Sequence, residues 1–485
     1  MLLSNNLGEK KLSTENIIES HDKAFKIGNY KAYSLHNLEK IPQLQEFCSD
    51  EQIHAMKVVG NVLPFKTNNY VVEQLINWNN PNDPIYILNF PQKEMLKTEH
   101  FKKMESVLEK TTDFLEIKQT ADSIRKELNP QPAGQKAYNV PMVNGLPLEG
   151  AQHKYRETLL FFPSQGQTCH AYCSFCFRWP QFVGDKNLRF ANKQAEQLVQ
   201  YVQEHSEIQD VLFTGGDPMV MKTKILSQYI KPLIDADIKH LQTIRIGTKS
   251  LSYWPYRFTE DNDSENLIDL FKEVEDNNLN LAIMAHFNHP RELVTGALKD
   301  AVKQIKSTGA QIRTQSPILK HINDKAKNWA IMWRKQVDLG MIPYYMFVVR
   351  DTGAKHYFEI PLLRAWEIFH EAYQKVSGIC RTVRGPSMSS LPGKIQILGP
   401  AELENKKIMV FRFIQGRNPD WTTRPFFAQY DPKASWLDDL KPLSGDKFFF
   451  EEELKQLQHN SDFWFKNDSG LDNKDIKDNE IVLTE

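Results

Sequence analysis

Short apolar runs alternate with amphipathic segments along the chain from residue 158 onward. Apolar runs bounded by turn residues are typical of buried strands, whereas apolar residues repeated every three or four positions indicate helices. This pattern predicts strands at 158–163, 210–215, 243–248, 279–287, 310–315 and 342–349. It predicts helices between or after these strands at 193–205, 292–306 and 361–376.

Six such strand–helix units in succession predict an α/β fold built around a parallel sheet. Their number, and their spacing of roughly 30 to 50 residues, suit a partial (β/α)6 TIM-like barrel. A doubly wound open sheet would produce the same alternation along the sequence. The pattern alone therefore leaves this alternative open.

The regions outside these units divide the chain further. Residues 1–150 are polar, contain helical stretches such as 98–128 and end in a segment rich in proline and glycine, which predicts an N-terminal helical region and a linker. The barrel is expected over residues 151–400, followed by a strand-rich extension at 401–440. Residues 441–485 are acidic and rich in Asn and Asp, so they are expected to form a peripheral tail.

The charge of the chain is balanced, with 60 Lys and Arg residues against 61 Asp and Glu residues among 485. A net charge of −1 gives no bulk field to attract nucleic acid or an anionic membrane, so a small-molecule partner is expected. No apolar run approaches the ~20 residues of a membrane span, and the first residues lack the apolar core of a signal peptide. Three of only five cysteines lie within eight residues, unlike a secreted disulfide framework. A cytoplasmic protein is therefore expected.

The three clustered cysteines, Cys169, Cys173 and Cys176, follow the first predicted strand closely. Thiolates are the usual ligands of iron–sulfur clusters, and a four-iron cluster normally takes four of them. The remaining cysteines, Cys48 and Cys380, are remote in sequence, so a fourth ligand is missing. A [4Fe-4S] cluster with three ligands leaves one iron open to chelate S-adenosylmethionine (SAM) and to reduce it to a 5′-deoxyadenosyl radical.

A structural zinc site is the competing interpretation of this motif, with His170 as the fourth ligand. Zinc sites usually contain spaced CxxC pairs, and the adjacent Cys169 and His170 would be awkward ligands of one ion. A non-catalytic iron–sulfur protein, such as a redox carrier, is a further alternative.

Polar or flexible residues stand at the end of each later predicted strand, where the active sites of barrels lie. The second strand ends in Gly215, Gly216 and Asp217, and paired glycines allow a ligand to approach the backbone closely. The following strands end, in order, in Arg245 to Lys249, His286 to His289, Arg313 to Ser316, and Arg350 with Asp351. A redox carrier would need the cysteines but not these residues.

Six segments resemble the lysine 2,3-aminomutase family of radical SAM enzymes in order and spacing. They are CHAYCSFCFR, VLFTGGDP, IRIGTKS, AHFNHPREL, GAQIRTQSPIL and PYYMFVV, and the resemblance extends from about residue 50 to about residue 430. It implies a radical SAM barrel in which the cluster is bound by Cys169, Cys173 and Cys176. The resemblance also implies that SAM is contacted by His286 and Gln315 and that its methionine part is lined by Gly215, Gly216 and Asp217. Arg178 is implied to bind the substrate α-carboxylate.

The same resemblance implies an isomerase that moves an amino group from Cα to Cβ of an amino acid. It also implies pyridoxal 5′-phosphate (PLP) bound by a lysine, and an electron donor such as ferredoxin or flavodoxin. The number of subunits stays open.

The PLP site departs from the family pattern. No glycine run followed by a lysine is present, and the candidate lysines are Lys394 and the pair Lys406–Lys407. Where the family has an arginine for the PLP phosphate, this chain has Thr158, with Arg156 two residues away. A PLP-independent radical SAM enzyme acting on an unknown substrate is therefore a second candidate.

The substrate site departs as well. The first of two family aspartates that bind the distal ammonium of lysine is replaced by Arg350, and the region of the second, IQILGP, contains no aspartate. A guanidinium repels an ammonium but pairs well with a carboxylate. We therefore expect free lysine to be a poor substrate and an acidic amino acid such as glutamate to be a better one. Asp351 would restore lysine binding if the loop were shifted by one residue.

Overall fold

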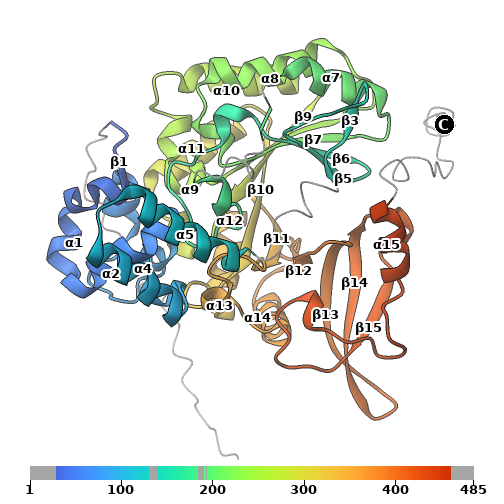
Figure 1. The fold of residues 1–485 in the computed structure, drawn as a ribbon. Coiled ribbons are helices and arrows are strands. Elements are labelled where there is room, and N and C mark those ends of the chain that lie inside the picture. The colour runs from blue at the N-terminus through green and yellow to red at the C-terminus, as the bar shows by residue number, and fades with distance from the viewer. Residues whose placement is uncertain (1–28, 130–138, 184–190, 193, 460–485) are drawn as a thin grey trace, which may run out of the picture.

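The computed structural model describes residues 29–129, 139–183, 191–192 and 194–459. The chain forms a mixed α/β fold around an 11-stranded sheet, with helices at the N-terminal side and a strand-rich body at the C-terminal side (Figure 1). Among the described residues, no helix is long and apolar enough to cross a membrane.

The sheet follows the chain in sequential order from β5 to β15, and its pairing does not close into a ring. The strands are β5 (Ala151–Tyr155), β6 (Thr158–Phe161), β7 (Asp210–Phe213), β8 (Thr243–Thr248), β9 (Asn280–His286), β10 (Gln311–Ile318), β11 (Ile342–Val348), β12 (Arg384–Ser389), β13 (Gly393–Leu403), β14 (Lys406–Gly416) and β15 (Pro425–Gln429). Strands β6 to β12 are parallel, and the outer pairs are antiparallel.

All six predicted strands are therefore confirmed, and β12 adds a seventh parallel strand. The sequential order lacks the reversal that defines a doubly wound sheet, so that alternative is wrong. The connecting helices are α7 (Ala195–Glu204), α8 (Thr223–Asp235), α10 (Ser264–Asp276), α11 (Gly296–Lys306), α12 (Ala326–Asp338) and α14 (Leu362–Gln374). The predicted helix 193–205 corresponds to α7, although residue 193 lies outside the described residues.

One side-chain contact shows that the sheet is strongly curved. Six strands separate β5 from β12, and a flat sheet would place them roughly 30 Å apart. Nevertheless, Nζ of Lys154 on β5 donates a hydrogen bond to the carbonyl oxygen of Ser390, just after β12. The two sides of the sheet therefore approach each other.

The main core lies between the sheet and the helices that connect its strands. Alternate residues of β7 and β8, such as Val211, Phe213 and Ile244, are fully buried, and α8 packs Leu226 and Ile230 on the same core. Burial of each such large side chain contributes about 1.5–3 kcal/mol. This is the apolar pattern that predicted the strands.

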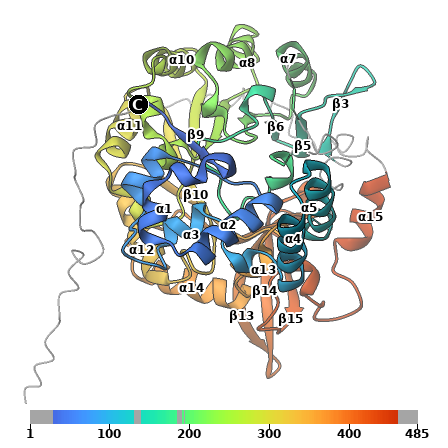
Figure 2. The ribbon, with the colours of Figure 1, turned by 60° about the vertical axis from the view of Figure 1, so that its left-hand side comes forward.

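The N-terminal helices form a second core and pack against the loops at the carboxyl ends of the strands. These helices are α1 (Pro42–Phe47), α2 (Asp50–Val62), α3 (Pro84–Asn89), α4 (Thr98–Lys110) and α5 (Phe114–Leu128). Their core includes Trp179, Tyr253 and Val349 from the sheet loops. In Figure 2 helices α1, α2 and α3 lie in front of β10. The helical region thus covers the end of the sheet where a barrel active site is expected.

The C-terminal strands build a third core. Strands β13 to β15 and helix α15 (Glu451–His459) enclose buried aromatic residues such as Phe411, Trp421 and Phe450. The described part of the predicted tail therefore covers the extension, and residues 460–485 lie outside the described residues. The boundary predicted at residue 400 falls within β13, because the sheet continues through this position.

Replacing Phe411 by alanine tests this third core. Phe411 is fully buried on β14, so Phe411→Ala should lower the free energy of unfolding by about 3–5 kcal/mol in urea denaturation followed by circular dichroism. Phe427 on the neighbouring strand β15 is 43% exposed and is the matched control, with an expected loss below about 1 kcal/mol. Equal losses for the two variants would contradict the arrangement.

Candidate active site at the carboxyl ends of the strands

The loop after β6 carries Cys169, Cys173 and Cys176, all partly buried. Burial raises the pKa of each thiol, that of Cys176 to about 12; Cys176 and Cys173 raise the pKa of Cys169 further, and Cys173 raises that of Cys176. The three side chains therefore lie close enough to repel one another as thiolates. Such a group is stable in its ionised form only with a compensating positive charge, which an iron–sulfur cluster supplies.

The geometry disfavours the zinc alternative. Nδ1 of buried His170 lies 2.8 Å from Oγ of Ser250, and burial lowers the pKa of His170 to about 3. Among the described residues, no three His, Cys, Asp or Glu side chains converge on one metal position. A cubane cluster does not need this convergence, because each thiolate binds a different iron atom. The cysteine loop therefore fits a cluster better than a single ion.

The N-terminal region holds the cysteine loop in place through backbone contacts. The amide of Tyr172 donates to the carbonyl of Lys66 at 2.8 Å, and that of Ser174 donates to the carbonyl of Leu88 at 2.9 Å. Nζ of Lys66 in turn donates to the carbonyl of Cys169 at 2.7 Å. The helical region, which had no assigned task from sequence, thus positions the cysteines.

Both glycines after β7 are required by the close approach of the cysteine loop. A Cβ atom on Gly216 would lie 2.4 Å from the carbonyl oxygen of Thr168. Gly215 has a φ of +147°, and its Cβ would lie 2.4 Å from Nε2 of Gln167. Oε1 of Gln167 is buried and has no hydrogen-bond partner among the described residues. This acceptor suits a ligand ammonium, and sequence reasoning missed it because no motif marks Gln167.

The Asp217 carboxylate connects the end of β7 to the end of β8 through hydrogen bonds. Its carboxylate accepts hydrogen bonds from Oγ1 of Thr248 at 2.7 Å, from the amide of Lys249 at 2.8 Å and from Oγ of Ser250 at 3.0 Å. Its own amide donates to the carbonyl of Thr168 at 2.7 Å. Asp217 therefore positions β8 and the cysteine loop, and its contact with SAM stays a prediction.

His286 and Gln315 are neighbours on β9 and β10, as expected for residues that share a ligand. Burial, and then Lys249, lower the pKa of His286 to about 3, so its imidazole is neutral at pH 7. The ring stacks on Phe175 of the cysteine loop at 6.4 Å between centroids. The neutral imidazole of His286 thus lies between the cysteine loop and the end of β9.

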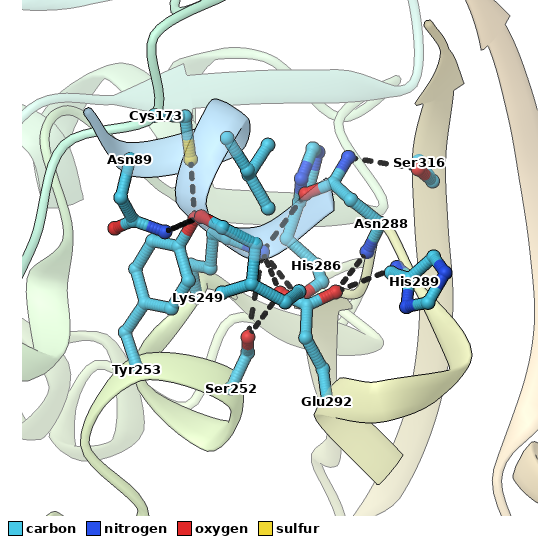
Figure 3. Close-up of polar contacts among 12 residues, drawn as sticks. Asn89, Cys173, Lys249, Ser252, Tyr253, His286, Asn288, His289, Glu292 and Ser316 are labelled. Atoms are coloured by element: carbon cyan, nitrogen blue, oxygen red, sulfur yellow. Dashed lines mark hydrogen bonds and ion pairs between the residues drawn. The ribbon is translucent and has the colours of Figure 1, made fainter. Parts of the chain in front are cut away.

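A buried ion pair links the ends of β8 and β9 beneath the cysteine loop (Figure 3). Nζ of Lys249 donates to Oε1 of Glu292 at 2.6 Å and to Oδ1 of Asn288 at 2.8 Å, and Glu292 is fully buried. Close by, the hydroxyl of Tyr253 lies 3.6 Å from Sγ of Cys173. Sequence reasoning did not identify this network, because Glu292 was expected only as part of a helix.

Two arginines lie side by side next to the cysteines. The Arg178 guanidinium lies 4.2 Å from the centroid of the Phe162 ring. Burial lowers the pKa of Arg178 to about 10; Cys176 opposes this decrease, whereas Arg350 adds to it. Nε of Arg350 is buried and unpartnered among the described residues. Paired cations of this kind favour an anionic ligand, as predicted for both positions.

Lys394 lies near the start of β13 among aromatic residues. Its Nζ is 4.2 Å from the centroid of the Tyr345 ring and 3.2 Å from Oε1 of Gln415, and burial lowers its pKa to about 8. Lys406 and Lys407 are exposed at the far end of the β13–β14 hairpin. Of the three candidate lysines, Lys394 is the one that is not exposed.

Thr158, at the position expected to face the PLP phosphate, is occupied by another contact. Its Oγ1 donates to Oδ2 of Asp210 at 2.9 Å, and Asp210 also pairs with Arg245 at 2.8 Å. This position therefore offers no cation of its own to a phosphate.

Two relatives extend these observations. The chain is 31% identical over 407 residues to a protein of Aquifex aeolicus named "Putative L-lysine 2,3-aminomutase", covering 84% of this chain and 93% of the relative. It is 33% identical over 227 residues to the L-lysine 2,3-aminomutase of Haemophilus influenzae, covering 47% of this chain and 62% of that enzyme.

A radical SAM methyltransferase from Sphaerobacter thermophilus is among the similar solved structures. It shares 15% identity with a TM-score of 0.36, over 50% of this chain and 69% of the other. No family model matches.

The Lys249–Glu292 pair can be tested by removing its cation. Lys249→Met leaves the Glu292 carboxylate buried and unpaired, so the free energy of unfolding should fall by about 3–5 kcal/mol in urea denaturation. The exposed pair Lys231–Glu273 is the matched control, and Lys231→Met should change the same quantity by less than about 1 kcal/mol. Equal effects at the two sites would show that the buried network does not hold the strand ends.

Proposed function

The chain belongs to the lysine 2,3-aminomutase family of radical SAM enzymes, and from this membership we propose that it migrates an amino group from Cα to Cβ of an acidic amino acid. The observation that carries the proposal is the pair Arg178 and Arg350 beside the last cysteine, whose guanidinium groups lie 5.3 and 5.2 Å from the centroid of the Phe177 ring. A redox carrier has no use for this pair. We also propose that β6 to β11 form a partial (β/α)6 barrel, which the curvature seen in the Lys154–Ser390 contact supports.

The cysteine loop is the proposed site of radical generation. The [4Fe-4S] cluster and SAM, when bound, supply a 5′-deoxyadenosyl radical that abstracts hydrogen. Cys169, Cys173 and Cys176 would hold the cluster, and Oε1 of Gln167 would accept a hydrogen bond from the SAM ammonium. The N-terminal helices cover this end of the sheet and exclude water from a reactive species.

The substrate is oriented by the two arginines. Arg178 is two residues from the last cysteine, so a bidentate contact with the α-carboxylate holds the substrate carbons near the radical source. Arg350 lies beside Arg178 and would bind a side-chain carboxylate. The distal ammonium of lysine would face the same guanidinium and be repelled.

Lys394 is the residue that would hold PLP. Its lowered pKa makes its amine available in the neutral form near pH 7, and the surrounding cations suit a phosphate. The second candidate is a PLP-independent radical SAM enzyme on an unknown substrate. The engagement of Thr158 with Asp210 favours that candidate.

Substrate choice is tested on anaerobically reconstituted enzyme with SAM, PLP and a reductant. Glutamate should give its β-amino isomer, and lysine should be converted at least about tenfold more slowly, because of repulsion by Arg350. Product formation is followed by mass spectrometry, and Cys176→Ala, which lacks a cluster ligand, is the inactive control. Robust turnover of lysine without activity on glutamate would reject the proposed substrate.

The PLP lysine is tested by borohydride reduction of the reconstituted protein followed by peptide mass mapping. A phosphopyridoxyl adduct is expected on Lys394, whose pKa is lowered by burial, and not on Lys406 or Lys407, which are exposed to solvent. Lys394→Arg should lose the adduct while keeping the cluster absorbance. Absence of any adduct on a protein with an intact cluster would select the PLP-independent candidate.

A further inference from the structure

Tyr253 is a buried residue that reaches the cysteine loop from the end of β8. It is the last residue of the short helix α9 (Ser250–Tyr253), which follows β8 closely. Nδ2 of the fully buried Asn68 donates both to the carbonyl of Tyr253 at 3.0 Å and to the carbonyl of His170 at 3.2 Å. One buried amide group therefore fixes the backbone of Tyr253 relative to the cysteine loop.

The hydroxyl of Tyr253 lies between Asn89 and Cys173 (Figure 3). Its oxygen is 3.6 Å from Sγ of Cys173, a separation that suits the large sulfur atom, and it accepts a hydrogen bond from Nδ2 of Asn89 at 3.3 Å. The same nitrogen donates to the carbonyl of Ile85 at 3.0 Å, so Asn89 presents its N–H groups on this side and not its oxygen. Within the described part of the chain, the hydroxyl has these two partners.

The protons of this contact fit a thiolate at Cys173 better than a thiol. A thiol donates its proton to the tyrosine oxygen, and the phenolic proton is then left without an acceptor among the described residues. A buried donor without a partner costs free energy. A thiolate bound to iron carries no proton, so its sulfur accepts the phenolic hydrogen while the oxygen still accepts from Asn89. All the groups are then satisfied.

Lys249 acts on the ring of Tyr253 and does not compete for the hydroxyl. Its Nζ lies 4.2 Å from the ring centroid and donates to Glu292 and Asn288. A cation over the face of a phenol draws electron density from the ring, which makes the hydroxyl a stronger donor. The ion pair beneath the cysteine loop thus supports the contact with Cys173.

We propose that Tyr253 is a positioning residue of the cluster site, whose hydroxyl donates a hydrogen bond to the Cys173 thiolate and raises the reduction potential of the cluster bound there. This inference rests on the proposed function, because it requires a [4Fe-4S] cluster on the three cysteines. Reduction takes one electron from a low-potential one-electron donor, and no bond is made or broken and no proton leaves the phenol. Since the thiolates of a reduced cluster carry more negative charge, the hydrogen bond stabilises the reduced form more than the oxidised form.

Redox titration of the anaerobically reconstituted full-length protein tests this hydrogen bond, with electron paramagnetic resonance of the reduced cluster as the readout. Tyr253→Phe keeps the ring and removes the hydroxyl. At the midpoint potential of the wild-type protein, its ratio of reduced to oxidised cluster should be at least about threefold lower, which is ~28 mV for a one-electron couple.

The matched control is Tyr70→Phe, which removes another buried hydroxyl from the same N-terminal core. The hydroxyl of Tyr70 lies 2.7 Å from Oγ1 of Thr295 rather than next to a cluster cysteine. The midpoint potential of this variant should match that of the wild-type protein.

Replacing Tyr253 by 3-fluorotyrosine tests the sign of the effect. Fluorine withdraws electron density from the phenol and strengthens the hydroxyl as a donor with little change of shape, so the midpoint potential should rise above the wild-type value. A role of Tyr253 in packing alone predicts no such rise. Because this protein keeps the hydroxyl, it also carries the test if Tyr253→Phe binds no iron.

Iron and sulfide analysis distinguishes failure of the inference from failure of the proposed function. Wild-type protein that binds no [4Fe-4S] cluster would reject both. Intact clusters with equal midpoint potentials in wild-type, Tyr253→Phe and fluorinated protein would overturn the inference and leave the proposed function standing. An equal shift in Tyr70→Phe would also overturn it, because the loss of any buried hydroxyl would then be sufficient.

Discussion

The contact between Gly216 and the backbone of Thr168 is the constraint on which the rest of the site depends. It brings the end of β7 against the cysteine loop so closely that no side chain fits between them. Asp217 then ties the same loop to β8, and backbone bonds from Lys66 and Leu88 hold it from the other side. The cysteine loop is thus held by the strand ends on one side and by the N-terminal region on the other. Neither side alone makes all the contacts that place the three thiols.

Electrostatics divides the site into two halves. Beneath the cysteine loop, Lys249 and Glu292 form an ion pair, and Lys249 also donates a hydrogen bond to Asn288. The charges of this half are therefore paired within the protein, and this half holds the strand ends together. On the other half, the guanidinium groups of Arg178 and Arg350 both lie near the Phe177 ring; burial lowers the pKa of Arg350, and Asp351 raises it. Two guanidinium groups thus face one carboxylate, and this contrast agrees with the proposed acidic substrate rather than a basic one.

The sequence was informative where local pattern determines structure. Apolar alternation predicted the strands, and the spacing of Cys169, Cys173 and Cys176 marked the cysteine loop, because both depend on neighbouring residues. The contact between Lys154 and Ser390 could not be identified in this way, since the two residues meet only when the sheet curves and no local pattern encodes that meeting. The sequence likewise predicted the N-terminal helical region but not its role. That role depends on the backbone carbonyl groups of Lys66 and Leu88, which every residue type carries.

The Lys154–Ser390 contact has a mechanical consequence. Between neighbouring strands, backbone ladders fix the separation at about 4.8 Å and resist widening. Across the seam between β5 and the turn after β12, a long and flexible lysine side chain makes the connection instead. Its stem can extend or fold through several rotamers at small cost. Across this seam, the two sides of the sheet are thus joined by a side-chain hydrogen bond rather than by backbone pairing.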